Sequence, residues 1–182
     1  MKKINIKSDE IMKSIRSILI FQSLSDEQIK ELEKICEVFE YSKGEVIVTQ
    51  DTVSPLLYGI LSGKVDIFVK SENKEDIYIS QVSQGDIFGE AAIFLDMTRT
   101  ANVEASTTVQ ILTITRKNLI KYINKIPQAG LKIFTYIIFS LLHKLKNANR
   151  ELAFEKESAV TAKDIINLEK FFPKTLAQII HD

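Results

Sequence analysis

Apolar and polar residues alternate in short runs between Glu45 and Ile114. The runs are rich in Val and Ile, and turn-forming pairs such as Ser62-Gly63 and Gln84-Gly85 separate several of them. A period of two at this spacing is typical of strands in an all-β sandwich or barrel, and not of strands that alternate with helices. The runs that we predict to be strands are Val46–Val48, Leu57–Leu61, Val65–Val69, Ile77–Ile79, Val103–Ala105 and Val109–Ile114.

The segment before these runs has the period of a helix. Ser25 and Gln28 can form a capping box, in which each side chain bonds to the backbone N–H of the other residue. The apolar residues that follow on one helical face are Ile29, Leu32, Ile35 and Phe39. Because Lys43-Gly44 ends this pattern, we predict an N-terminal helical segment over residues 1–42.

Helical periodicity returns after the last predicted strand. Thr115 is a suitable N-cap for a short helix that stops at Pro127, and a long helix is predicted over residues 128–157. Apolar residues along the long helix repeat at alternating steps of three and four, which defines the a and d positions of a heptad repeat. These residues, called the seam below, are Leu131, Phe134, Ile138, Leu141, Leu145, Ala148 and Leu152.

A second apolar stripe runs beside the seam, at Ile133, Ile137 and Leu142. A helix with two adjoining apolar faces can pack on its own barrel and on a second subunit, so we predict a homodimer through the helix at residues 131–152. The alternative is one broad stripe that faces the core. The last residues, 158–182, contain a capping signal and a break at Pro173, which predict a short helical tail.

Composition argues against several classes of site. The 24 basic and 24 acidic side chains cancel, so no net charge attracts nucleic acid or an anionic membrane. Cys36 is the one cysteine, and we expect a buried, unreactive thiol and no thiolate metal cluster. His143 and His181 lie outside the predicted strands, which argues against a metal-dependent β-barrel enzyme. No apolar stretch suits a secretory signal or a membrane span, so we expect a cytoplasmic protein.

The stretch from Gly85 to Ala105 fits neither a core strand nor an ordinary loop. Ile87-Phe88 is expected to lead out of the barrel, and Gly89-Glu90-Ala91-Ala92 can begin a short helix whose free N–H groups attract an anion, above all phosphate. Arg99 follows after a short loop and can reach the same anion, while Glu90 can accept hydrogen bonds from a neighbouring hydroxyl group. An anion beside a hydroxyl describes a cyclic nucleotide. The alternative is an ordinary ion pair between Glu90 and Arg99 that braces a loop, as exposed pairs often do.

This stretch resembles the phosphate-binding cassette of cyclic nucleotide-binding domains, the family of the catabolite activator protein and the regulatory subunits of cAMP-dependent kinase. The residues that carry the resemblance are FGEAA at 88–92, Arg99, and TANVEA at 100–105. Outside the cassette, residues 21–32 resemble the family's first helix, residues 43–48 and 57–68 its first strands, and the helices on either side of Pro127 its B and C helices. The resemblance covers about residues 15–155.

The resemblance implies a mainly β fold with flanking helices. It places a double-stranded β-helix (jelly-roll) barrel at residues 43–127, with the cassette at 85–105, between N-terminal helices and a long C-terminal helix. Glu90 is expected to bind the ribose 2′-hydroxyl and Arg99 the cyclic phosphate, which the backbone amides of Ala91 and Ala92 share. The implied ligand-binding residues are Gly89, Glu90, Ala91, Ala92, Arg99 and Thr100, and no catalytic or metal-binding residue is implied. The purine is expected between the barrel and the long helix, near Tyr136 or Ser140.

The chain departs from the family pattern at several positions. Ala91 stands in place of the usual leucine, and Thr98 in place of a common proline. Residues 51–54 lack the glycines that the family shows there, so we expect this loop to take another shape. None of these changes removes a group that would contact the ligand.

Two functions fit these observations. The first is a stand-alone sensor of cAMP or cGMP, without cofactor or catalysis, whose C-terminal helices shift on binding and alter a surface for an effector protein. The second is a ligand-free domain of the same fold that acts as a dimerisation or scaffold module. Many relatives carry a DNA-binding module after the long helix, but residues 158–182 are too few for one and their charges balance, so we expect no DNA binding.

Overall fold

The computed structural model describes residues 1–5, 8–71, 73, 75–94 and 97–158. The chain forms two compact units, residues 1–139 and residues 140–182, and the second is described as far as residue 158. Within the described ranges, no helix has the length and apolar character that crossing a membrane requires. The predicted helical tail at 158–182 lies outside the described residues, apart from Ser158 itself.

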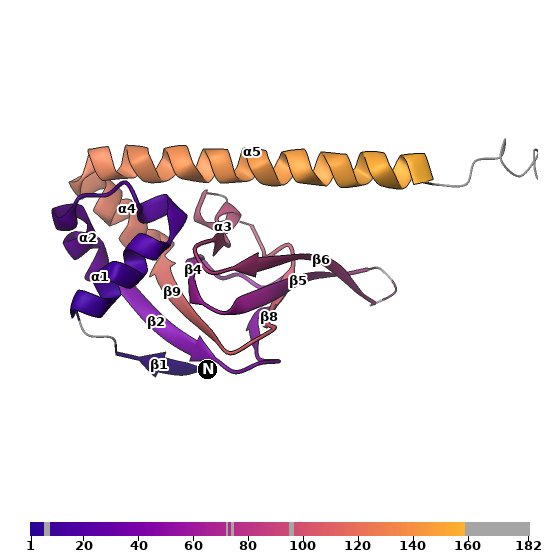
Figure 1. Cartoon of the computed structure of the whole chain (residues 1–182), viewed down its shortest axis with the longest axis horizontal. Coiled ribbons are helices and arrows are strands. Elements are labelled where there is room, and N and C mark those ends of the chain that lie inside the picture. The colour runs from indigo at the N-terminus through magenta and orange to yellow at the C-terminus, as the bar shows by residue number, and fades with distance from the viewer. Residues whose placement is uncertain (6–7, 72, 74, 95–96, 159–182) are drawn as a thin grey trace, which may run out of the picture. The chain divides into compact units, whose positions relative to one another are not determined.

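The strands of the first unit form two antiparallel sheets (Figure 1). One sheet has the order β1 (Lys2–Ile4), β2 (Cys36–Tyr41), β9 (Val109–Thr115), β4 (Leu56–Ser62) and β7 (Ile87–Phe88). The other has the order β3 (Val46–Val48), β8 (Asn102–Ala105), β5 (Lys64–Lys70) and β6 (Asp76–Ser83). In both sheets, strands near the start of the chain pair with strands that come much later in the sequence, as β2 does with β9 and β3 with β8. This is the pairing of a jelly roll. The predicted mainly β, jelly-roll fold with flanking helices is therefore confirmed.

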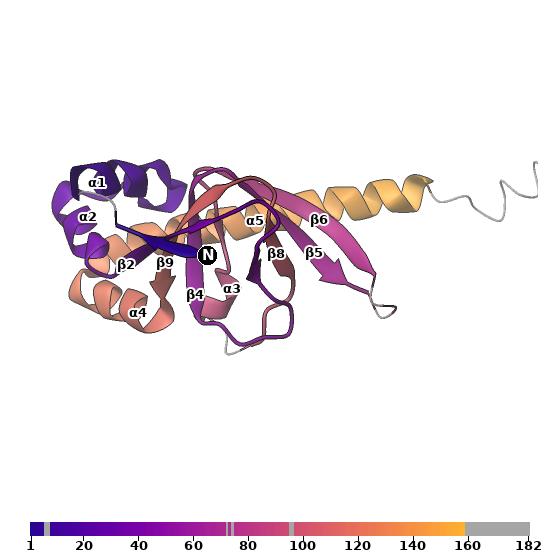
Figure 2. The ribbon, with the colours of Figure 1, turned by 90° about the horizontal axis from the view of Figure 1, so that it is seen from below.

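Helices flank these sheets. They are α1 (Ser8–Ser17), the 3₁₀ helix η1 (Leu19–Phe21), α2 (Asp26–Glu33), α3 (Ala91–Phe94), α4 (Arg116–Lys125) and α5 (Pro127–Ser158). Figures 1 and 2 show α1, α2 and α4 gathered at one end of the strands, whereas the β5–β6 hairpin extends from the other end. The first unit therefore has a helical end and a β end.

The core has two parts, and β4 and β9 contribute to both. Leu57 and Ile114 pack with the helices, whereas Ile60 and Ile111 pack between the two sheets. All four side chains are at most 2% exposed, so the central strands are buried on both faces. This explains why β4, with the sequence LLYGILS, is a nearly continuous apolar run that departs from the expected period of two.

The prediction of a helical segment over the whole of residues 1–42 is wrong in part. The capping box at Ser25 and Gln28 does begin a helix, but α2 ends at Glu33 and β2 follows it. Six residues of β2 pair with β9 and three with β1. Ile35 and Phe39, which a continuous helix would place on one face, pack against different parts of the core. Long-range strand pairing therefore overrides the local helical spacing.

Most of the other predicted elements are confirmed. Each predicted strand matches a strand of the structure, and Thr115 caps α4 by accepting a hydrogen bond from the Asn118 N–H at 3.2 Å. Ile87-Phe88 does not lead out of the barrel, because it forms β7 and pairs with β4. The long helix begins at Pro127, one residue earlier than predicted, since proline is well suited to the first position of a helix.

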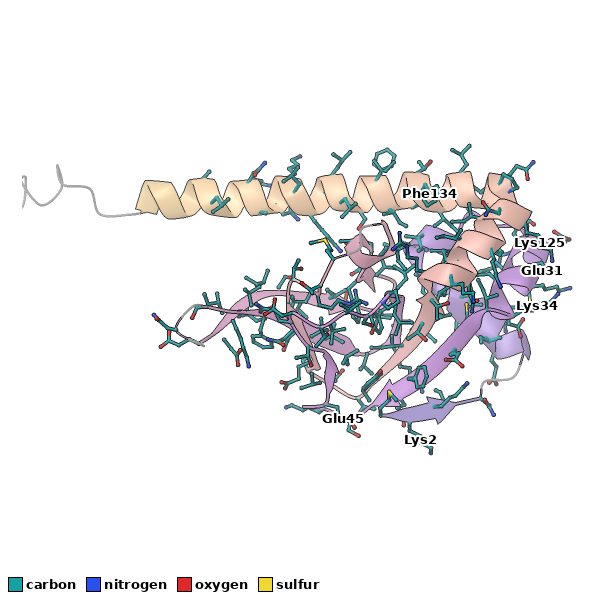
Figure 3. The ribbon with its side chains drawn as sticks, turned by 180° about the vertical axis from the view of Figure 1, so that it is seen from behind. Lys2, Glu31, Lys34, Glu45, Lys125 and Phe134 are labelled. Atoms are coloured by element: carbon teal, nitrogen blue, oxygen red, sulfur yellow. The ribbon has the colours of Figure 1, made fainter. Side chains whose placement is uncertain are left out.

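Side chains also tie α2 to α4. The Glu31 carboxylate in α2 accepts hydrogen bonds from Lys34 and Lys125, each at 2.6 Å, and Figure 3 shows the three side chains together. The hydroxyl of Tyr122 in α4 donates to the Gln28 carbonyl in α2 at 3.0 Å. α2, before the barrel, and α4, after it, are therefore joined by a buried tyrosine and an exposed ion-pair cluster.

The two apolar stripes of α5 have different surroundings. Ile133 and Ile137 are fully buried in the core of the first unit. The seam residues Leu131 and Ile138 are 71% and 57% exposed, so the alternative of one broad core-facing stripe is wrong. Leu142, which the sequence places on the second stripe, is also exposed.

Cys36 is half-buried at the start of β2. Its thiol donates a hydrogen bond to the Leu32 carbonyl at 3.1 Å and packs against the core. Desolvation, and then the charge of Glu33, raises the pKa of the thiol above its usual range. The thiol stays protonated, as the expected unreactive cysteine should.

Candidate anion-binding site

The predicted cassette, residues 85–105, is held at both ends by the sheets. At its start β7 pairs with β4, and at its end β8 pairs with β3 and β5. The short helix predicted between them is present as α3, whose first turn is closed by a hydrogen bond from the Ile93 N–H to the Glu90 carbonyl at 3.1 Å. The described part of the cassette thus sets Glu90 just before α3 and Arg99 just before β8.

Arg99 is buried, with 6% of its surface exposed. Its Nη2 donates to the Leu56 carbonyl at 2.8 Å and reaches the Ser54 hydroxyl at 3.5 Å, and its Nη1 donates to the Gly89 carbonyl at 3.3 Å. Its Nε is also buried and has no hydrogen-bond partner among the residues that the structure describes. The guanidinium group is therefore fixed by neutral oxygen atoms and retains a buried donor for a further acceptor.

An aromatic pair lies against the guanidinium group. Tyr58 in β4 and Phe88 in β7 are both buried, and their rings stack with centroids 4.6 Å apart and an angle of 2° between the planes. The Cζ of Arg99 lies 5.3 Å from the centroid of the Tyr58 ring. This distance allows a cation–π interaction, which is stronger where water is excluded.

Glu90 is also buried, at 7% exposed. Burial lowers the pKa of Arg99 from its usual value, while the phenol of Tyr58 and the charge of Glu90 act in the opposite direction. Arg99 remains charged, because an arginine starts from a pKa far above neutrality. Both side chains are buried, so an ion pair of Glu90 and Arg99 that braces the loop would not be an exposed one.

The backbone of Arg99 is held by the loop before β4. Its N–H donates to the Thr52 carbonyl, and its carbonyl accepts from the Asp51 N–H, both at 2.8 Å. Asp51 has a φ of 64°, a conformation that glycine adopts most readily and that aspartate tolerates better than most residues. Asp51 thus supplies a positive φ in the loop that lacks the family's glycines.

The remaining predicted site residues surround this centre. Gly89, with a φ of 77°, joins β7 to Glu90, and its carbonyl accepts from Arg99. Ala91 begins α3 and is exposed, and Ala92 follows it in the same helix. Thr100 is exposed next to Arg99. Of the residues predicted near the purine, Tyr136 is 38% exposed and Ser140 is half-buried.

Sequence reasoning missed the residues that hold Arg99. Ser54 and Leu56 lie 45 and 43 positions before Arg99 in the sequence. Tyr58 lies in β4 together with Leu56. The alternation of apolar residues did place Tyr58 in a strand, but only the pairing of β4 with β7 brings that strand beside the cassette. The sequence signal that could have found them is the arginine itself, since a buried guanidinium group needs acceptors from a neighbouring strand.

The arrangement is suited to binding a small anion next to a hydroxyl group. A buried cation with an unpartnered N–H favours an anion, and a charge-assisted hydrogen bond to it would be stronger than the bonds to carbonyl oxygens. A buried carboxylate close by favours a hydroxyl donor.

Comparison with known proteins identifies the domain. Residues 38–125 match the family model of the cyclic nucleotide-binding domain. A cGMP-dependent protein kinase of Drosophila melanogaster is 29% identical over 126 residues, which are 68% of this chain and 14% of the kinase. The cAMP-activated global transcriptional regulator CRP of Pasteurella multocida is 27% identical over 139 residues, which are 74% of this chain and 65% of the regulator. The chain therefore spans less than two thirds of either relative.

A solved structure shares the fold. The regulatory subunit of a cAMP-independent protein kinase A from Trypanosoma brucei aligns with a TM-score of 0.66 and 19% sequence identity, over 79% of this chain and 51% of that one. The matching family model, the relatives and the shared fold agree on the kind of domain to which this part of the chain is similar. Residues 38–125, just under half of the chain, therefore match the cyclic nucleotide-binding domain family.

Proposed function

We propose that this chain is a regulatory protein that binds cAMP or cGMP without catalysis and without a cofactor. Arg99 and the backbone amides of Ala91 and Ala92 hold the cyclic phosphate, and Glu90 accepts hydrogen bonds from the ribose 2′-hydroxyl. Gly89 and Thr100 complete the ligand-binding residues. The observation that carries the proposal is the buried guanidinium group of Arg99, whose Nε lacks a partner within the described part of the chain.

Burial of this cation has an energetic cost that an anion would reduce. An ion removed from water loses several kcal/mol of hydration unless its surroundings compensate. The carbonyls of Leu56 and Gly89 compensate in part. A cyclic phosphate carries a full negative charge and several acceptor oxygens, so it would complement Arg99 better than carbonyl dipoles alone.

The regulatory part of the proposal concerns the C-terminal helices. Leu119 in α4 and Ile133 and Ile137 in α5 are fully buried in the same core, so a rearrangement of the domain on binding would be felt by both helices. We propose that these helices pass the change to an effector protein in the cytoplasm. The exposed seam of α5, residues 131–152, is the proposed homodimer interface, and neither DNA nor a membrane is a proposed partner.

A second function has one observation in its favour. Arg99 already donates three hydrogen bonds to groups of the protein, so the fold does not require an anion in order to satisfy most of its donors. A ligand-free domain that serves as a dimerisation or scaffold module is therefore the competing proposal.

A ligand titration separates the two functions. Because ligand binds the folded state, a nucleotide at 100 times its dissociation constant should raise the free energy of unfolding by about 2.7 kcal/mol. We expect cAMP or cGMP to raise the melting temperature in a dose-dependent way, and a flat response to both would support the scaffold function. Non-cyclic AMP is the matched ligand control for recognition of the cyclic phosphate.

Replacement of the arginine tests its role in the site. Arg99→Ala should weaken nucleotide binding by about 2–5 kcal/mol, since it removes one partner of a buried charge pair. Arg150→Ala, at an exposed position in α5, is the control and should bind as the wild type does. If Arg99→Ala bound cAMP and cGMP with wild-type affinity, the assignment of Arg99 to the phosphate would be wrong.

A further inference from the structure

The ring of Tyr58 lies over the guanidinium group of Arg99. The tyrosine is 4% exposed, and its ring centroid lies 5.3 Å from the arginine Cζ. Two residues earlier on the same strand, the Leu56 carbonyl accepts from Nη2 of the arginine at 2.8 Å. One short segment of β4 therefore presents both a hydrogen-bond acceptor and an aromatic ring to Arg99.

Tyr58 is itself firmly positioned. Its ring stacks on Phe88 with an angle of 2° between the planes, and its hydroxyl lies 3.5 Å from the Ser54 hydroxyl. Phe88 comes directly before Gly89, whose carbonyl accepts from Nη1 of Arg99 at 3.3 Å. Tyr58 and Phe88 are paired residues of β4 and β7. Their stack thus joins the strand that supplies the Leu56 carbonyl to the strand that Gly89 directly follows.

An aromatic ring can hold the guanidinium group without consuming its hydrogen-bond donors. The interaction with the ring is electrostatic and acts across the face of the π-system, so every N–H that points along the guanidinium plane stays available. A fourth oxygen acceptor would instead have taken Nε or the second N–H of Nη1, the two donors that the three hydrogen bonds leave. Nε has no partner among the described residues, and this is a donor that a phosphate oxygen can take.

We infer that Tyr58 is a positioning residue of the anion-binding site, whose ring orients the guanidinium group of Arg99 so that Nε is offered to the cyclic phosphate. This inference rests on the proposed function, since it assigns Tyr58 a role in binding of the same ligand. Tyr58 does not contact the ligand in this account. Its contribution to affinity passes entirely through Arg99.

The test compares rings of the same shape and different electrostatic character. In Tyr58→Phe the ring and the stack on Phe88 are kept and only the phenol, which also favours the charged form of Arg99, is lost, so this variant is the reference that separates the ring from the hydroxyl group. A ring-fluorinated phenylalanine incorporated at position 58 keeps the shape but removes the negative potential of the ring face. It should weaken binding of the preferred nucleotide about tenfold relative to Tyr58→Phe, at an equal denaturant midpoint.

Phe88→Leu is the matched control for packing. It removes the other half of the stack, loses stability, and leaves the Tyr58 ring facing Arg99, so it should bind nucleotide far better than the fluorinated variant does. Equal affinity of the fluorinated variant and Tyr58→Phe would overturn the inference and leave the proposed function intact. Failure of the wild type to bind either nucleotide would overturn both. A loss of affinity that followed stability across all the variants would mean that Tyr58 has a structural role alone.

Discussion

At the scale of single residues, Gly89 is the position where the site tolerates least change. Its φ of 77° is a conformation that residues with a Cβ rarely adopt. A Cβ at this position would lie 2.6 Å from Nη1 of Arg99, 2.9 Å from the Leu56 carbonyl oxygen and 3.1 Å from the Tyr58 ring. These are the guanidinium group of Arg99 and two of the groups that hold it, so the absent side chain is a condition for their close approach.

Gly89→Ala should therefore damage binding as well as folding. The positive φ alone costs an alanine about 1–2 kcal/mol of stability. The added methyl group must also displace the arginine or the carbonyl that fixes it, and we expect nucleotide affinity to fall at least about tenfold, as for loss of a well-placed charge-assisted hydrogen bond. Denaturant unfolding and calorimetric titration measure the two effects separately.

Gly44→Ala is the control, because Gly44 has nearly the same φ, 84°, and no atom within 4 Å of the position that a Cβ would take. It should lose a similar amount of stability and keep its affinity for nucleotide. Equal affinity losses in the two variants would show that backbone strain, and not the crowding around Arg99, accounts for the effect.

The candidate site could be predicted in part from the sequence. The spacing of Glu90 and Arg99 within a family-like cassette placed both residues correctly at the ends of a short helix and a loop. Their burial was not predictable, because it depends on β4 passing beside β7, a contact between residues about 30 positions apart. The sequence around Leu56 and Tyr58 does not indicate that either residue contributes to the site, since both have the pattern of ordinary strand residues.

At the scale of elements, the region around α2 shows which predictions fail and why. Ile29 and Leu32 lie on one face of a helix and are buried, as their spacing predicted. The same spacing continues to Phe39, but the segment CEVFEY has a second pattern, in which Val38 and Tyr41 are buried and pair with β9. Helical and strand patterns overlap here, and a partner strand some 70 residues later decides between them.

The ion pairs of Glu31 make the free energy of unfolding depend on pH, and the one with Lys125 joins α2 to α4. Hydrogen bonds from Lys125, and then from Lys34, lower the pKa of Glu31 to about 2 from its usual 4.5. The folded state thus favours the ionised carboxylate, and its contribution to stability is fully present above pH 4.5. As the pH falls towards 2, the unfolded state takes up the proton first and this contribution is lost.

Glu31→Gln should consequently be less stable than the wild type at pH 7, and the difference should shrink between about pH 4.5 and pH 2. The cluster is solvent-exposed, so we expect a small effect that added salt weakens further. Denaturant unfolding across this pH range, at low and high salt, measures it.

The lysine variants Lys125→Gln and Lys34→Gln separate the two bridges. Lys125→Gln should lower the free energy of unfolding more than Lys34→Gln does. Lys125 lowers the pKa of Glu31 more than Lys34, and its hydrogen bond joins residues 94 positions apart in α2 and α4. A difference between the wild type and Glu31→Gln that stayed constant from pH 7 to pH 2 would contradict this account.

At the scale of the whole molecule, α5 presents more apolar surface than its own domain covers. Ile133 and Ile137 are buried, whereas Leu131, Ile138 and Leu145 are 71%, 57% and 58% exposed. The exposed residues keep the steps of three and four of a heptad repeat, which is the pattern for pairing with a second helix. An exposed stripe of this kind favours association, because it removes apolar surface from water.

The last prediction concerns this seam. Leu145→Glu places a carboxylate at an a position, where two copies related by a twofold axis would bring like charges together in an apolar contact. We expect the wild type to sediment as a dimer and Leu145→Glu as a monomer at the same concentration. Asn147→Glu adds the same charge on the opposite face of the helix and should stay dimeric. A wild type that remained monomeric at high concentration, or a dimeric Leu145→Glu, would remove the seam as the interface between two copies.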